Sequence, residues 1–232
     1  MTKKTEHIET WALVPMKSLT EAKHRLSGIF NLSERRDLSL AMLSDVLTTL
    51  KQISHLASTA VITHDPLVLD LAHSWNTRVL KESKTGVNAA VTEAAKILSL
   101  ESCTTMLVVP GDVPLATPEE FSALLEVQNP GATISIATDH RGTGTNALAC
   151  SPPTVIAPCF GQRSLVRHQE AARNVGTVAT VLELPGLALD IDIPDDIARL
   201  LEKKPQGHTY AFLRKVVGET LYQVPVITNE QT

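Results

Sequence analysis

Short apolar runs alternate along this chain with longer segments that have helical periodicity. Several of the short runs are apolar without interruption, which is typical of strands buried on both faces of a sheet. Six segments are predicted strands on this basis: Trp11–Met16, Ser58–Thr63, Thr77–Lys81, Thr105–Pro110, Thr133–Ala137 and Val178–Leu182.

Other segments place apolar residues three or four positions apart, as an amphipathic helix does. Five helices are predicted in this way: Ser33–Leu50, Pro66–Trp75, Val87–Leu100, Pro118–Val127 and Arg163–Val175. The alternation of strands and helices predicts an α/β protein, a Rossmann-like three-layer α/β/α sandwich with a mostly parallel sheet. In such a fold, ligands bind at the carboxyl ends of the strands.

The length of 232 residues suits a single domain. We assign residues 1–204 to this domain and regard residues 205–232 as a C-terminal tail whose role the sequence does not reveal. Aromatic residues make up only 3% of the chain, so a surface that stacks the bases of a nucleic acid is not expected. The net charge is −4 and the sequence has no block of like charges, which also argues against a polyanionic partner.

The three cysteines contain no C-x-x-C pair, so they fit neither a disulfide framework nor a zinc site. The first residues are polar and charged, without the apolar core of a signal peptide. No stretch approaches the roughly 18–20 apolar residues of a membrane span. We therefore expect a soluble, cytoplasmic protein with no membrane partner.

The loop after the first predicted strand carries three cations within nine residues. Pro15 lies near the end of this strand, and Lys17, Lys23 and Arg25 follow it. Cations at the carboxyl edge of a sheet can bind a triphosphate and neutralise the pyrophosphate that leaves it, so these three are the predicted catalytic residues. This loop has neither the P-loop motif nor the glycine pattern of a dinucleotide-binding fold. A solvated basic loop is the alternative interpretation.

A second segment joins a predicted strand to a long predicted helix. Gly86 lacks a side chain, which lets backbone N–H groups approach a ligand, and Asn88 can hydrogen-bond a base or a ribose. Together with Pro15, Lys17 and Glu82, these two residues form the predicted nucleotide site. An ordinary loop and helix start would have the same appearance.

Three aspartates are candidate ligands of magnesium, a hard ion that prefers oxygen donors. Asp112 follows a strongly apolar strand, at the edge where α/β proteins bind ligands. Asp190 and Asp192 would point to the same side of an extended segment, roughly 6.5 Å apart, where they repel each other unless a cation lies nearby. The alternative is a turn role for Asp112 and a helix-cap role for Asp192, which leaves Asp190 unexplained.

Two further segments combine glycines with small hydroxyl side chains. Thr145 lies in one of them, and Gly161 and Ser164 lie in the other, at the start of a predicted helix. Hydroxyl and backbone N–H groups so placed can hold a phosphate or a carboxylate, and we predict that they bind the acceptor. A loop and a helix cap are the alternative. For His168 we favour a structural role on its helix.

Taken together, these segments resemble one family, the guanylyltransferases of deazaflavin coenzyme F-420 biosynthesis. The matching segments follow the order found in that family and extend from about Trp11 to Leu201. They are Val14–Lys17, Lys23–Ser27, Gly86–Ala90, Pro110–Pro114, Gly142–Leu148, Phe160–His168 and Asp190–Asp196.

The resemblance implies a fold of the nucleotide-diphosphosugar transferase type. It implies transfer of GMP from GTP to 2-phospho-L-lactate, phosphoenolpyruvate or 3-phospho-D-glycerate, with release of pyrophosphate. It implies magnesium as the cofactor, with the three aspartates as its ligands, and contacts from Thr145, Gly161 and Ser164 to the phospho-acid. The product would pass to the next enzyme of coenzyme biosynthesis, and a homodimer is compatible with this role.

Two other functions compete with this interpretation. The first is a related transferase with a molybdopterin or sugar phosphate acceptor, but its usual G-G-x-S opening is absent here. The second is a non-catalytic nucleotide-binding module. Retention of all three candidate metal aspartates argues against such a module, because binding alone does not need them.

Overall fold

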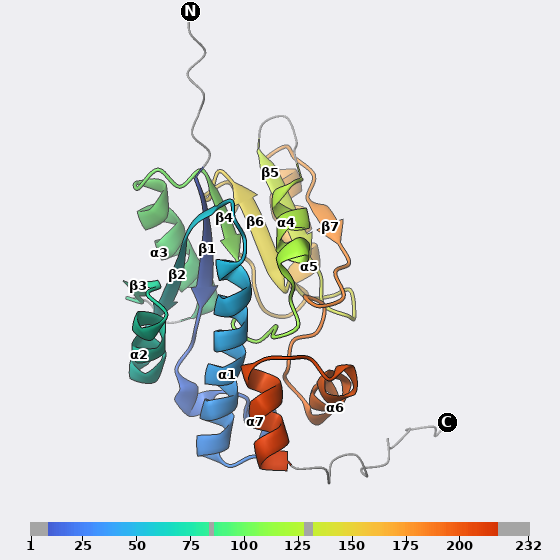
Figure 1. Ribbon diagram of the computed structural model, residues 1–232. Coiled ribbons are helices and arrows are strands. Elements are labelled where there is room, and N and C mark those ends of the chain that lie inside the picture. Colours follow the sequence, from blue (N-terminus) through green and yellow to red (C-terminus); the bar gives the residue numbers. More distant parts are fainter. Residues whose placement is uncertain (1–8, 84–85, 128–131, 218–232) are drawn as a thin grey trace, which may run out of the picture.

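The computed structural model describes residues 9–83, 86–127 and 132–217. Its strands form one seven-stranded sheet with the order β3-β2-β1-β4-β6-β5-β7 (Figure 1). Strand β6 runs antiparallel to β4 and β5, and every other neighbouring pair is parallel. The strands are β1 (Thr10–Pro15), β2 (Leu56–Thr63), β3 (Arg78–Lys81), β4 (Thr105–Val108), β5 (Thr133–Ala137), β6 (Ala147–Ser151) and β7 (Thr180–Leu182). The predicted α/β fold with a mostly parallel sheet is confirmed.

Helices cover both faces of this sheet. Ala12 and Val14 of β1 share a buried cluster with residues of α1, α2 and α4, whereas Leu13 shares a second cluster with residues of α3 and α5. Successive side chains of a strand point to opposite faces, so the two clusters are the two faces of the sheet. The helices are α1 (Leu32–Lys51), α2 (Pro66–Ser74), α3 (Val87–Ser99), α4 (Pro118–Leu125), α5 (Ser164–Asn174), α6 (Pro194–Lys203) and α7 (His208–Val217).

One strand and two α-helices were not predicted from the sequence pattern. Strand β6 begins at Ala147, directly after the glycine- and hydroxyl-rich segment around Thr145, and its residues Ala-Leu-Ala-Cys-Ser have little strand preference. Helices α6 and α7 follow Ile193 and Gly207, beyond the last predicted helix. Strand β6 forms because β4 and β5 supply hydrogen-bonding partners on both sides.

Helix α1 begins at Leu32, one residue before the predicted start at Ser33. Its N-cap is Asn31. The Asn31 side chain accepts a hydrogen bond from the Glu34 N–H, and the Glu34 carboxylate accepts one from the Asn31 N–H. Such a capping box satisfies two N–H groups that a helix start otherwise leaves unpaired. The helix that follows runs 20 residues, from Leu32 to Lys51, and leads to the start of β2.

A third buried cluster lies beyond the sheet and involves α6 and α7. Leu213 of α7 packs there with Leu38 and Met42 of α1, and Leu200 of α6 joins them. The region beyond residue 204 therefore includes a helix packed on α1, as Figure 1 also shows. Residues 218–232 of the predicted tail lie outside the described part of the chain. Within the described residues, no helix is both long and apolar enough to cross a membrane.

Candidate active site

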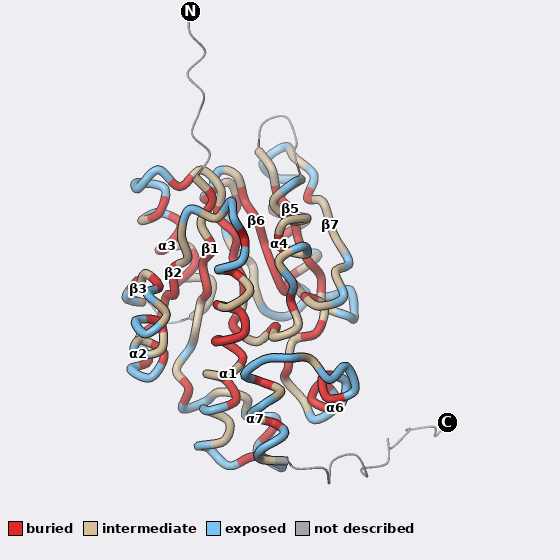
Figure 2. The backbone as a smooth tube through the Cα atoms, in the orientation of Figure 1, coloured by how far each residue is buried: buried red, intermediate tan, exposed pale blue. Residues whose placement is uncertain are grey.

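A cavity of about 910 Å³ opens at the carboxyl ends of β1, β2 and β4. Its walls come from the loop after β1, the ends of β2, β3 and β4, the start of α3 and the segment around Asp192. Figure 2 shows the buried central strands that end at this edge, surrounded by more exposed loops. A volume of this size suits a nucleotide-sized ligand. The cavity lies where parallel α/β sheets bind their ligands.

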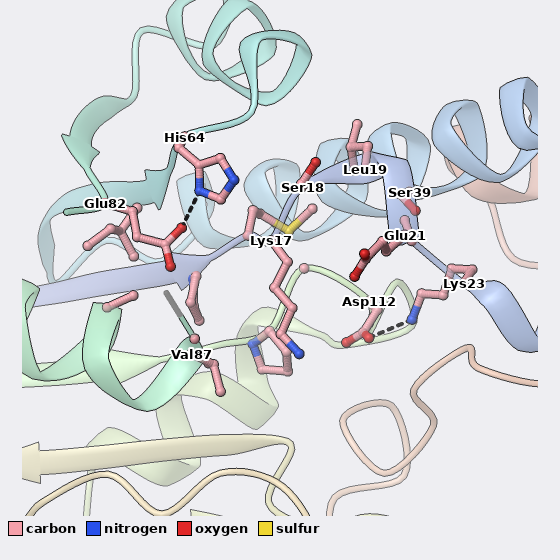
Figure 3. Close-up of a pocket in the computed structure, with 18 of the residues that line it drawn as sticks. Lys17, Ser18, Leu19, Glu21, Lys23, Ser39, His64, Glu82, Val87 and Asp112 are labelled. Carbon is pink, nitrogen blue, oxygen red and sulfur yellow. Dashed lines mark hydrogen bonds and ion pairs between the residues drawn. The ribbon is translucent and has the colours of Figure 1, made fainter. Parts of the chain in front are cut away.

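One end of the cavity holds an ion triad. The Lys23 ammonium lies 2.6 Å from Asp112 Oδ2 and 2.7 Å from Asp192 Oδ1 (Figure 3 shows the first contact). Asp112 follows β4, and the backbone of Ile191 donates a hydrogen bond to the Asp112 carbonyl at 3.1 Å. This bond brings the Asp192 segment against the end of β4. The sequence placed these three residues in one site, and the structure brings them into contact.

Opposite charges in the triad stabilise the ionised forms of Lys23 and Asp192. Burial of Lys23 works against its charge, but Asp112 and Asp192 offset this and hold the pKa of the ammonium above its ordinary value. Burial likewise works against a charged Asp192, yet Lys23, Arg25 and Lys17 lower the pKa of that carboxyl below its usual range. Both groups therefore stay ionised near neutral pH.

Asp190 lies close by but has a different partner. Its carboxylate accepts a hydrogen bond from the Asn146 amide at 3.2 Å, and the same amide donates to the Leu187 carbonyl at 2.9 Å. Burial, followed by the nearby charge of Asp112, raises the pKa of Asp190. The segment from Asp190 to Asp192 is not part of a strand. Sequence analysis did not identify Asn146 as the residue that orients Asp190.

Asp112, Asp190 and Asp192 offer oxygen donors of the kind that suits magnesium. Carboxylate oxygens are the ligands that this ion prefers. The Lys23 ammonium shows that a cation fits between two of the carboxylates. Among the described residues, however, no three Asp, Glu, His or Cys side chains already converge as a metal cage. The predicted helix-cap alternative for Asp192 does not hold, because the Asp196 carboxylate accepts hydrogen bonds from the N–H groups of Asp192 and Ile193.

A histidine–glutamate pair lies at the other end of the cavity, and only its glutamate, Glu82, was among the predicted site residues. The His64 ring nitrogen Nδ1 lies 2.6 Å from Glu82 Oε2, and both residues line the cavity. The Glu82 side chain is 7% exposed, whereas that of His64 is 50% exposed. Figure 3 shows this pair and the Asp112–Lys23 pair on opposite sides of Lys17. His64 directly follows β2, and that position at a strand end was the available signal.

The remaining predicted nucleotide residues divide into two groups. Pro15, Lys17 and Gly86 line the cavity, and Gly86 has the positive φ of 105° that favours glycine. Asn88 instead holds a neighbouring loop, since its amide donates to the Phe160 carbonyl at 3.1 Å and accepts from the Phe160 N–H at 2.7 Å. Arg25 is exposed and does not line the cavity, although its charge acts on Asp192.

The predicted acceptor residues meet around a buried histidine. The Thr145 hydroxyl lies 3.0 Å from His168 Nδ1, and His168 Nε2 accepts a hydrogen bond from the Cys159 N–H at 2.8 Å. Ser164 is buried at the start of α5, one turn before His168. Gly161 has a φ of 113° and open space where a Cβ would lie. The structural interpretation of His168 therefore fits, because both ring nitrogens connect loops of this region.

The protonation of His168 gives this region a pH dependence. Burial, with the charge of Arg167, lowers the pKa of His168 to about 4. In the unfolded chain His168 binds a proton as the pH falls below about 6.5, whereas in the folded chain it stays neutral until about pH 4. The free energy of unfolding therefore decreases as the pH falls from about 6.5 to 4. We expect a loss of roughly 3 kcal/mol over this window. Urea denaturation at several pH values should show a weaker pH dependence for His168→Gln, and equal dependence would contradict the assignment.

The sequence of this chain matches one protein family along most of its length. The family model described as Guanylyl transferase CofC like matches residues 10–222. The phosphoenolpyruvate guanylyltransferase of Rubrobacter xylanophilus is 36% identical over 193 residues, which cover 83% of this chain and 94% of that protein. The 3-phospho-D-glycerate guanylyltransferase of Colwellia psychrerythraea is 31% identical, with 83% and 91% of the two chains covered.

Solved structures show the same fold at low identity. A protein from Desulfovibrio desulfuricans, assigned to the nucleotide-diphospho-sugar transferases, has a TM-score of 0.73 and 14% identity, with 90% and 95% of the chains covered. A nucleotidyl transferase from Methanothermobacter has a TM-score of 0.64, 14% identity, and 90% and 100% coverage. The fold type implied by the resemblance is therefore confirmed. The extent of the family match shows that this chain belongs to the CofC-like guanylyl transferases.

Proposed function

We propose that this protein transfers GMP from GTP to a small phosphorylated carboxylic acid, with magnesium as cofactor. The observation that carries the proposal is the Lys23–Asp112–Asp192 triad in a nucleotide-sized cavity at the carboxyl edge of the sheet. The curated relatives are named for phosphoenolpyruvate and for 3-phospho-D-glycerate, so these are the first acceptors to test. 2-Phospho-L-lactate is the third acceptor of the proposal.

The reaction needs no covalent enzyme intermediate. A phosphate oxygen of the acceptor attacks the α-phosphorus of GTP, and the bond from that phosphorus to the bridging oxygen of the β-phosphate breaks. Pyrophosphate leaves with the electron pair of that bond. Lys17 and Lys23 line the cavity and neutralise the phosphates as charge develops on the leaving group. Magnesium, when bound by Asp112, Asp190 and Asp192, supplies further charge neutralisation and orientation.

The acceptor lies on the α5 side of the cavity in this proposal. Phe160 lines the cavity, and Gly161 and Ser164 follow it toward the start of α5. Backbone N–H groups at such a helix start favour an anion. Thr145 contributes by fixing His168, which in turn holds the loop at Cys159. A cytoplasmic location, a homodimer and delivery of the product to the next enzyme of coenzyme biosynthesis complete the proposal.

The direct test is to incubate the protein with GTP, magnesium and each of the three acceptors. We expect stoichiometric pyrophosphate release and a guanylylated product with at least one acceptor, and none when the acceptor is omitted or the metal is chelated. A molybdopterin or sugar phosphate acceptor would appear as GTP consumption only with those compounds. Nucleotide binding without any pyrophosphate would instead support a non-catalytic module.

His64 is expected to contact the nucleoside part of GTP. Strands β2 and β3 end beside His64 and Glu82, whereas the aspartates lie at β4 and beyond, two to three strands away in the sheet. At about 4.8 Å per strand this is roughly 10–14 Å, which suits the separation of a base from the outer phosphates. We therefore assign the nucleoside to the His64 end and the triphosphate to the Lys23 end.

Replacing His64 with alanine should raise the KM for GTP by about tenfold and leave the KM for the acceptor within about twofold. The reason is the loss of one oriented hydrogen bond to the nucleotide. The control is His73→Ala, which removes an exposed histidine of α2 that does not line the cavity. Steady-state kinetics with each substrate varied in turn provide the measurement. A rise confined to the acceptor KM would place His64 on the acceptor side.

A further inference from the structure

Lys23 occupies the space between two candidate metal ligands. Its ammonium contacts Asp112 at 2.6 Å and Asp192 at 2.7 Å, and its side chain is only 9% exposed. A magnesium ion coordinated at about 2.1 Å by the same two oxygens, Asp112 Oδ2 and Asp192 Oδ1, would lie in this same space. An ammonium and a metal ion cannot both occupy it. The contacts of Lys23 and metal contacts through these two oxygens therefore exclude each other.

The local backbone directs Lys23 into this position. Lys23 has left-handed φ and ψ angles of 50° and 42°, just before the short 3-10 helix His24–Leu26. A residue with a side chain rarely adopts this conformation, and where it does the surrounding contacts hold it there. The lysine side chain is long and flexible, so its ammonium can leave the carboxylates without a change in the backbone.

We propose that Lys23 is the resident counter-ion of this site and that a divalent cation binds by displacing its ammonium from between Asp112 and Asp192. The inference rests on the proposed metal-dependent function. Charge balance favours the exchange, because one ammonium leaves part of the charge of two carboxylates unneutralised and a divalent ion neutralises both. The released ammonium then lies in the cavity that Lys17 also lines, where the proposal places the phosphates.

Lys23 thus competes with the metal, and removing its charge should strengthen metal binding. In Lys23→Met the side chain stays unbranched and only one atom shorter, but it carries no charge and cannot pair with the carboxylates. We expect the Kd for Mg²⁺, measured by titration calorimetry on the nucleotide-free protein, to fall at least about tenfold. The control is Lys17→Met, which makes the same change in net charge. Lys17 is exposed and forms no ion pair with a described residue, so its change should stay within about threefold.

A second measurement uses the unaltered protein and does not depend on the folding of a variant. Acetylation of lysines, followed by peptide mass spectrometry, reports how accessible each amine is. We expect Mg²⁺ to accelerate the labelling of Lys23 severalfold and to leave that of Lys17 unchanged.

Different failures have different meanings in these experiments. If Lys23→Met binds Mg²⁺ as the unaltered protein does, or more weakly, and Lys23 labelling does not respond to Mg²⁺, the displacement is overturned. Guanylyl transfer would then still stand on its own pyrophosphate assay. If neither the unaltered protein nor either variant binds Mg²⁺, both the displacement and the metal assignment fail.

Discussion

Replacing Asp192 with asparagine is expected to lower turnover by at least about 100-fold while the fold survives. An amide binds magnesium less strongly than a carboxylate and cannot form an ion pair with Lys23, so stabilisation of the transferred phosphate is lost. The Asp192 side chain is 44% exposed, and Asp196, not Asp192, caps helix α6, so little folding energy depends on it. Steady-state turnover at saturating GTP, acceptor and Mg²⁺ provides the measurement.

Asp190→Asn is expected to have an effect of the same size, because an amide binds magnesium less strongly than a carboxylate. The control for both variants is Asp195→Asn, an exposed carboxylate in the first turn of α6 that does not line the cavity. Its turnover should stay within about twofold. Near-normal turnover of Asp190→Asn or Asp192→Asn would remove that residue from the proposed metal site.

Replacing Asp45 with alanine is expected to destabilise the protein by roughly 3 kcal/mol or more. Asp45 lies within α1, and its carboxylate accepts hydrogen bonds from the N–H groups of His208 at 2.6 Å and Thr209 at 2.8 Å. Each hydrogen bond to a charged group contributes about 1.5–3 kcal/mol, and the two N–H groups at the start of α7 lose their partner. Helix α7 should therefore detach from α1 in part of the population.

Equilibrium urea unfolding checks this prediction, with hydrogen exchange of α7 as a local measurement. The control is Asp37→Ala, which removes an exposed aspartate of the same helix and should change stability by less than about 0.5 kcal/mol. Unchanged stability of Asp45→Ala would show that α7 contributes little to the domain. In that case residues 205–217 would resemble the separate tail that the sequence suggested.

The sequence by itself determined the fold class, because its signals are local. Uninterrupted apolar runs and helical spacing gave all six of the strands predicted and all five of the helices, with ends shifted by a few residues. The location of the candidate site could also be predicted from the sequence, because ligand-binding side chains follow the carboxyl ends of strands in an α/β sheet. Lys17, Asp112 and Gly86 each lie in the loop that follows a strand, and they line the same cavity.

Only the tertiary structure decided which side chains meet. Lys23 contacts Asp112 across 89 positions of sequence and Asp192 across 169, and Asp45 reaches His208 across 163. No local pattern encodes such pairs, because they depend on which strands lie side by side. Asn88 and Thr145 had suitable chemistry for ligands, yet their polar atoms bind Phe160 and His168 instead. The residue type determines which groups a side chain can bind, and the packing of the fold determines which of these groups lies within reach.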